Sequence, residues 1–218
     1  MNEVGRHSVP VGRRAANKDA RRAAIVQSAR SLFLERGYAG MSMSALAESL
    51  RASKATLWRY FKSKNAVFFA VVEAEAKSMH AGINAAFARD QDLEAGLLAF
   101  CQSFLAAIEA PDAVALSRVV TAESGRTPEI ARIFYKAAAA YPREQLSLFL
   151  QRHRSKLRDE SIENMSAILI DLCNSHQIAV ILGEKKAGAR EPRKLADQYV
   201  EIFYRAFVLQ TGGRGLHS

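Results

Sequence analysis

Apolar residues recur along most of the chain in steps of three and four, the spacing that places them on one face of an α-helix. No convincing run alternates apolar and polar residues, the pattern of a half-buried strand. Only 12 Gly and 5 Pro interrupt long stretches rich in helix-favouring residues. The pattern predicts an all-α protein, with helices over 17–36, 63–88, 93–109, 112–124, 129–140, 142–154, 161–183 and 192–210, and two short ones within 42–61.

The segment 42–61 differs from the rest because it contains two helices of about eight residues, too short to be stable alone in water. A tight corner joins them, so they must pack against the helix before them. This is a helix-turn-helix pattern, and it predicts a second helix that enters the major groove of DNA. The predicted core of the three-helix unit is Ile25, Leu32, Phe33, Met43, Leu46, Leu50, Leu57 and Phe61.

The charge is concentrated in the same part of the chain. Residues 1–64 contain 13 Lys and Arg against 4 acidic residues, whereas residues 65–218 contain 18 of each, so the N-terminal part carries the whole net charge of +9. A localised positive potential is typical of a surface that binds a polyanion. The alternative is a basic surface that serves only solubility.

Several short stretches carry a family resemblance: Arg22 to Ile25, Leu32-Phe33, Arg36-Gly37-Tyr38, Met43 to Ala47, and the run from Ser53 to Lys64. Together they resemble, over residues 18–68, the N-terminal DNA-binding domain of the TetR family of transcriptional regulators. The resemblance implies that the chain dimerises through its C-terminal helices. It also implies that a small molecule in the larger domain releases the DNA.

The resemblance also assigns DNA contacts residue by residue. Ser42, Lys54, Thr56, Trp58, Tyr60 and Lys64 correspond to positions that contact the DNA backbone, and Ser44, Lys54, Ala55 and Arg59 to positions near base edges. Ser53 is a further candidate DNA-binding residue. Either Ser42 or Ser44 is also a suitable helix cap. The family usually has glycine where this chain has Arg51, so we expect a left-handed backbone there. Trp58 stands where tyrosine is usual, and its alternative role is that of a core aromatic.

The C-terminal body is rich in Phe and Ala, a mixture of large and small side chains that can leave a cavity. The alternative is that these aromatic residues only fill the core. The helices over 161–183 and 192–210 have apolar residues on more than one face, which predicts that they pack on the body and on a second copy. The candidate ligand-binding residues are Phe100, Phe104, Phe134 and Phe149, with Glu123, Tyr135 or His176 as polar anchor.

No catalytic or metal-binding constellation is present in the sequence, so we expect neither an enzyme nor a cofactor. Cys101 and Cys173 lie in apolar helical stretches, as expected of core residues in a reducing compartment. No apolar run reaches a membrane span and no signal-like segment is found, which predicts a cytoplasmic protein. The predicted organisation is a disordered basic arm (1–16), the helix-turn-helix domain (17–64), a helical ligand-binding and dimerisation domain (65–211) and a tail (212–218).

These observations favour a homodimeric repressor that binds an inverted-repeat operator of double-stranded DNA and is released by a small hydrophobic effector. Two alternatives remain at this point. One is an activator, or a regulator that needs its ligand to bind DNA, on the same scaffold. The other is an architectural protein that coats DNA without sequence preference. The basic arm, with Arg6, Arg13 and Arg14, is either inert or reaches into the minor groove.

Overall fold

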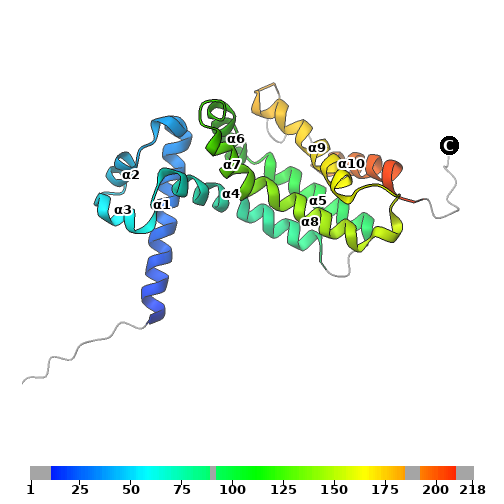
Figure 1. Cartoon of the computed structure of the whole chain (residues 1–218), viewed down its shortest axis with the longest axis horizontal. Helices are drawn as coiled ribbons and strands as arrows, with labels where there is room; N and C mark the ends of the chain where they lie inside the picture. The colour runs from blue at the N-terminus through cyan, green and yellow to red at the C-terminus, as the bar shows by residue number, and fades with distance from the viewer. Residues whose placement is uncertain (1–10, 89–91, 185–191, 210–218) are drawn as a thin grey trace, which may run out of the picture. The chain divides into compact units, whose positions relative to one another are not determined.

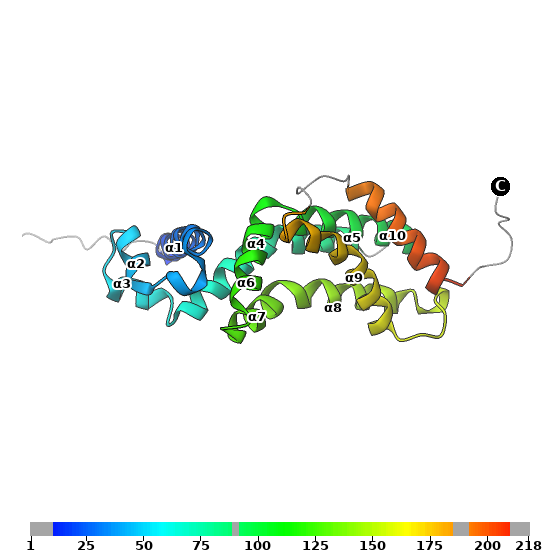
Figure 2. The same ribbon diagram turned by 90° about the horizontal axis from the view of Figure 1, so that it is seen from above.

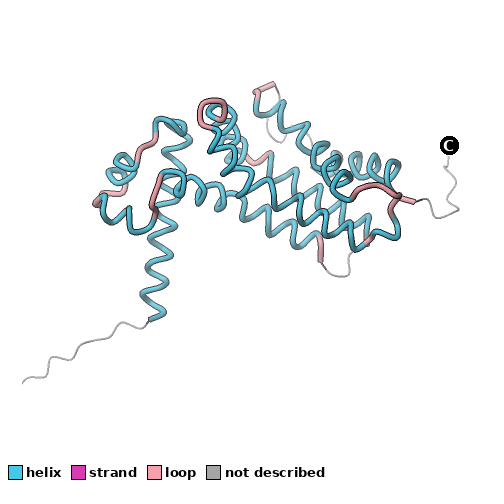
Figure 3. The backbone as a smooth tube through the Cα atoms, viewed as in Figure 1, coloured by secondary structure: helices cyan, strands magenta, loops and turns pink. Residues whose placement is uncertain are grey.

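The computed structural model describes residues 11–88, 92–184 and 192–209, and the side chains within these ranges from residue 15 onward (Figure 1). Every regular element in these ranges is helical, and Figure 3 shows no strand among them. The elements are α1 (Val11–Gly40), α2 (Met43–Ser49), α3 (Lys54–Tyr60), α4 (Lys64–Ala86), α5 (Leu93–Ile108), α6 (Pro111–Glu123), α7 (Pro128–Phe134), the π-helix η1 (Tyr135–Ala139), α8 (Ala140–Arg152), the 3-10 turn η2 (Arg154–Lys156), α9 (Ile162–Ile181) and α10 (Pro192–Phe207).

The chain forms two compact units, Met1–Val71 and Val72–Ser218, which we call the DNA-binding unit and the body. The boundary falls within α4, later than the boundary predicted at residue 64. Helix α1 also begins earlier than predicted, at Val11 rather than Asn17 or Asp19. The rest of the predicted arm and the predicted tail, residues 212–218, lie outside the described residues.

An aromatic cluster holds the DNA-binding unit together. The Phe33 and Phe68 rings meet edge to face with centroids 5.0 Å apart, and Tyr38 stacks on Phe33 at 5.7 Å. Gly37, which has φ 70°, breaks the helical backbone just before Tyr38, so the glycine predicted to stop the helix marks a kink. Six of the eight predicted core residues are buried, whereas Met43 and Leu50 are half-buried.

The body is built on the contact of α10 with α5 and α9, and α8 packs on α9 (Figures 1 and 2). Phe100 and Phe149 are fully buried, and each stacks on Phe87, with ring centroids 5.2 and 4.4 Å apart. Cys101 and Cys173 are buried free thiols with 3.9 Å between their Sγ atoms. The pKa of Cys101 is raised by its hydrogen bond with Cys173 and by burial, which suits an unreactive core residue.

Two predicted helix starts in the body are wrong. Asp112 was expected to cap a helix that ends near residue 124, but α6 begins at Pro111 after Ala110, and the Asp112 carboxyl group lies in its first turn. Pro142 was expected to open a helix but lies inside α8, which begins at Ala140 and follows η1 without a break. A proline is tolerated there because it lies in the first α-helical turn after the π-helix.

Among the described residues, no single helix is long and apolar enough to cross a membrane. Helices α5 and α6 meet that criterion only when they are counted together, and they are bent by 67° at their junction.

Candidate DNA interface and ligand cavity

Serine side chains fix the start of both helices of the corner. The Ser42 Oγ accepts a hydrogen bond from the Ala45 N–H at 3.1 Å, and the Ser53 Oγ accepts one from the Thr56 N–H at 3.1 Å. Each bond satisfies a backbone donor that the first turn leaves unpaired. Ser42 is therefore the cap of α2, and Ser44 lies exposed in its first turn.

The corner between α2 and α3 contains a strained residue. Arg51 has φ 48° and is the one non-glycine residue with positive φ in the described part of the chain, which confirms the left-handed backbone predicted there. Its N–H donates to the Glu48 carbonyl at 2.9 Å, and the Ala52 N–H donates to the Ala47 carbonyl at 3.0 Å. These bonds close the turn despite a strain of roughly 1 kcal/mol for a residue with a Cβ.

Helix α3 has a buried apolar face and an exposed polar face. Leu57 and the C-capping Phe61 are buried against the unit, which fixes the rotation of the helix. Trp58 is 43% exposed, so its interpretation as a core aromatic is wrong. The other predicted contacts on α3 are accessible: Lys54, Ala55 and Arg59 are exposed, and Thr56 and Tyr60 are partly exposed.

Lys64 lies at the start of α4, directly after the Ser63 cap. Its Nζ donates to the Ala39 carbonyl at 3.3 Å and lies 4.2 Å from the centroid of the Tyr38 ring. The ammonium group is therefore held beside the N-terminus of α4, where unpaired N–H groups also attract an anion. The predicted DNA-contacting residues thus lie on three helix starts and on the open face of α3.

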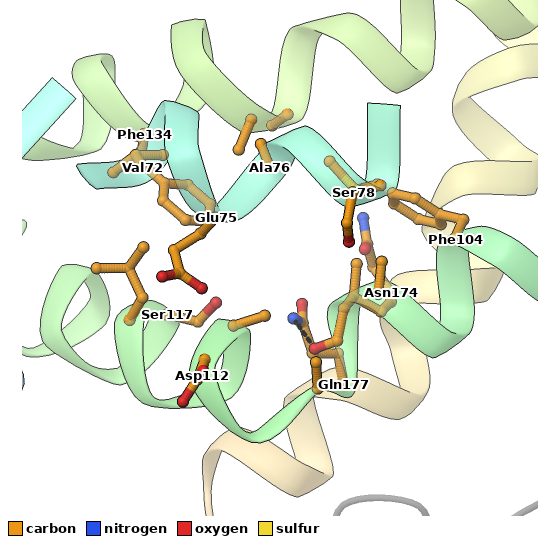
Figure 4. Close-up of a pocket in the computed structure, with 18 of the residues that line it drawn as sticks. Val72, Glu75, Ala76, Ser78, Phe104, Asp112, Ser117, Phe134, Asn174 and Gln177 are labelled. Carbon is orange, nitrogen blue, oxygen red and sulfur yellow. Dashed lines mark hydrogen bonds between the residues drawn. The ribbon is translucent and has the colours of Figure 1, made fainter. Parts of the chain in front are cut away.

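The body contains a cavity of about 650 Å³, within the usual range for a small-molecule site. Its wall is mostly apolar and is formed by side chains from α4, α5, α6, α7, η1, α8 and α9 (Figure 4). Three of the predicted ligand residues line it: Phe104, Phe134 and Tyr135. The π-helix contributes the wall residues Tyr135, Ala138 and Ala139.

The other four predicted ligand residues are not among those that line the cavity. Phe100 and Phe149 fill the core, as the alternative interpretation held. His176 is buried, and its Nε2 lies 3.4 Å from the Glu109 Oε1. Glu123 is the last residue of α6. The cavity instead receives polar groups that the sequence analysis missed: Glu75, Ser78, Ser103, Asp112, Ser117, Arg143, Asn174 and Gln177.

Within the described ranges, no group of three or more His, Cys, Asp or Glu side chains is placed to hold a metal ion. The fold and the two sites define a class of protein: a helix-turn-helix DNA-binding unit joined to a helical body that contains a ligand-sized cavity.

Two family models match the chain and identify this class of protein. The model described as "Bacterial regulatory proteins, tetR family" matches residues 25–71, and the model described as "AefR-like transcriptional repressor, C-terminal domain" matches residues 95–208. The chain belongs to the TetR family of transcriptional regulators.

Two relatives show how far the similarity extends. The chain is 24% identical over 178 residues to the HTH-type transcriptional repressor Rv1474c of Mycobacterium tuberculosis, a match that covers 81% of this chain and 88% of that protein. It is 29% identical over 101 residues to the HTH-type transcriptional activator FasR of Mycolicibacterium smegmatis. The latter match covers 45% of this chain and only 46% of FasR.

Solved structures share the fold. The Flavonoid-responsive Regulator FrrA is 26% identical, with a TM-score of 0.73 and coverage of 88% of this chain and 100% of that one. A TetR-family regulator from Mesorhizobium loti MAFF303099 is 22% identical, with a TM-score of 0.72 and coverage of 87% and 98%.

Proposed function

We propose that the protein is a homodimeric repressor that binds an inverted-repeat operator and is released from it by a small hydrophobic effector. The observation that carries the DNA-binding part is the open polar face of α3, in the segment that contains the whole net positive charge. Lys54 and Arg59 supply cations on that face, and Arg59 has the planar guanidinium that reads guanine edges. Action on bacterial DNA would place the protein in the cytoplasm.

Apolar side chains on the last two helices support the dimer. Ile178 and Leu182 of the α9 end are 58% and 73% exposed, and Ile202 of α10 is 48% exposed. Large apolar residues in such numbers on two helices that pack together favour a partner surface. A two-fold axis through them would join α9 and α10 of two copies into a four-helix bundle and hold the two α3 helices about 34 to 36 Å apart.

The cavity supports the effector. It is large enough for a small organic molecule, and FrrA, a relative that is 26% identical, is a flavonoid-responsive regulator. Val72, Ala76 and Met79 of α4 line the cavity, and the same helix begins at Lys64 in the DNA-binding unit. A ligand that favours one position of α4 needs only about 1 to 3 kcal/mol of difference between states to change DNA affinity.

The similarity to FasR favours a second candidate, an activator on the same scaffold. The two are distinguished by transcription in vitro from a template that carries the selected site, because a repressor lowers the amount of transcript and an activator raises it. An architectural protein that coats DNA remains the candidate from another class.

Selection of bound sequences from random double-stranded DNA tests the DNA-binding part. We expect one palindrome to be preferred over bulk DNA by about a thousandfold or more, as for other specific regulators. Equal affinity for scrambled duplexes would contradict it and favour the architectural protein.

Arg59→Ala tests the reading of bases on the selected site. We expect a loss of about 1 to 3 kcal/mol at one base pair and relaxed preference there. Arg59→Lys is the matched control, because it keeps the charge and loses the bidentate geometry. A uniform loss over all sequences would assign Arg59 to the DNA backbone instead.

A further inference from the structure

The first part of α1 extends beyond the other helices of the DNA-binding unit (Figure 1). All ten residues from 15 to 24 are exposed, whereas the next two, Ile25 and Val26, are buried. A helical segment in which every residue is exposed gains little from packing, and a free helix of this length is only marginally stable in water. The core of the unit therefore does not explain the residues of this segment.

The exposed segment carries a row of cations on one side. Arg22, Arg21 and Lys18 lie three, four and seven residues before the buried Ile25, which is the spacing of neighbours on one helix face. Asp19 is the one acidic residue among the ten. Like charges three and four residues apart destabilise a helix, and a polyanion bound along the row removes that repulsion. The row continues, toward the N-terminus, the face through which α1 packs on the unit.

A contact with the end of α3 places this row beside the candidate DNA surface. The guanidinium carbon of Arg22 lies 5.2 Å from the centroid of the Phe61 ring, and Phe61 is the C-cap of α3. Lys62, the next residue, is exposed. The cations of α1 thus begin at the C-terminal end of the helix that presents Lys54 and Arg59.

We propose that Lys18, Arg21 and Arg22, which we call the α1 row, bind phosphates of the DNA that flanks the half-site read by α3. This inference rests on the proposed function, because it extends the same DNA surface. A helical segment of ten residues is about 15 Å long, at 1.5 Å per residue. It therefore spans about four base pairs of flanking DNA, at about 3.4 Å each.

The composition of the segment favours the DNA backbone over other partners. Lysine and arginine form charge-assisted hydrogen bonds with phosphate oxygens. Alanine is the only apolar residue type between residues 15 and 24, so the segment offers no large apolar side chain to a membrane or to a protein interface. Its charge is complementary to DNA, and it lies in the unit that carries the whole net positive charge of the chain.

Two duplexes test the α1 row with the full-length protein. One ends at the edges of the selected palindrome, and the other continues for six base pairs on each side. We expect the parent protein to bind the longer duplex about tenfold more tightly or better, and hydroxyl-radical footprinting to show protection about four base pairs beyond each edge. The double variant Lys18→Gln, Arg21→Gln keeps good helix formers and leaves the Arg22 contact with Phe61 in place.

The double variant should bind the short duplex like the parent protein and should lose the gain on the longer one. Its slope of log affinity against log salt on the longer duplex should fall by about two for each half-site. Lys77→Gln with Arg158→Gln is the matched control, because it removes one exposed lysine and one exposed arginine from the body. It should retain both the gain and the slope, and unchanged melting temperatures show that all variants are folded.

Three outcomes would overturn the inference. The first is equal affinity of the parent protein for the two duplexes, and the second is a similar loss in the double variant and in the body control. The third concerns the sequence of the flanks, because phosphate contacts carry no sequence information. If flanks made only of G·C pairs abolished the gain that A·T flanks give, the segment would read the minor groove instead.

Failure of this inference is separable from failure of the proposed function. Preference for one palindrome is measured in the selection experiment and does not depend on the flanks. If no palindrome is selected, the salt slope on a random-sequence duplex of the longer length still tests the α1 row, because backbone contacts also act in non-specific binding. The double variant should show the lower slope there too, and an unchanged slope would overturn the inference.

Discussion

The candidate side chains of the DNA-binding unit lie on its exterior, whereas those of the body lie around an interior cavity. In the first, Lys54, Trp58 and Arg59 project from a helix whose other face is buried through Leu57. In the second, Glu75 and Ser117 point into a cavity among core residues. An exterior site can change without loss of core packing, whereas residues around an interior site must satisfy the core and the ligand together. This difference predicts which substitutions affect binding and which affect stability.

The largest effect is expected at the proposed dimer interface, on the exposed apolar surface of α10. Ile202→Glu puts a charge in the apolar surface of α10 and should give monomers by light scattering, with operator affinity reduced about a hundredfold or more because two linked sites become one. Ile202→Leu is the control and should remain dimeric. Persistent dimers in Ile202→Glu would place the interface elsewhere.

Gly96 on α5 tests the packing of the interior directly. A Cβ built there would lie 2.2 Å from the Phe149 Cζ, and Phe149 is fully buried, so the ring cannot move away without a cost. We expect Gly96→Ala to lower the free energy of unfolding of the body by about 1 to 3 kcal/mol in denaturant titration. Gly125→Ala, at a site with no atom within 4 Å, should have little effect. Equal stability of the two variants would show that the α5 contact is loosely packed.

The same contrast explains what the sequence could and could not predict. The choice of Ser42 or Ser44 as the cap of α2 follows from residues within one turn, whereas the left-handed backbone at Arg51 was expected from the family resemblance. Phe100 and Phe104 are one turn apart on the same helix, yet only Phe104 lines the cavity. Helical spacing marks both as inward-facing but does not show where neighbouring helices leave space.

Polar lining residues were missed for a related reason. Glu75 lies beside the apolar stripe of α4. The sequence pattern does not distinguish it from the solvent-exposed acidic residues of the same helix. Its position in a cavity depends on α6, which is distant in sequence. The run of alanines from 137 to 140 likewise gave no signal for a π-helix.

Arg51→Gly should have a smaller effect, now on the DNA-binding unit. Removal of the Cβ relieves the strain at φ 48°, and the greater freedom of glycine in the unfolded chain offsets part of the gain. We expect the unit to be stabilised by up to about 1 kcal/mol in thermal unfolding. Arg51→Ala removes the same charge but keeps the Cβ, so it should show no gain. A gain in both variants would assign the effect to charge repulsion instead of backbone strain.

The smallest effect, on the salt dependence of binding, is expected at Lys64. If its ammonium group contacts a phosphate, Lys64→Ala should weaken binding to all sequences and reduce the slope of log affinity against log salt by about one. Lys77→Ala is the matched control, because Lys77 is an exposed lysine of the same helix on the body side of the boundary. The slope should not change in that variant.

The interactions of Lys64 within the protein make this test decisive. Its contacts with the Ala39 carbonyl and the Tyr38 ring also stabilise the start of α4, so loss of the side chain could weaken DNA binding by loosening the unit. Loosening lowers affinity at every salt concentration by the same factor, because no counterion is released or retained. A phosphate contact changes the slope. An unchanged slope with lower affinity would therefore assign Lys64 to the structure of the unit and remove it from the DNA surface.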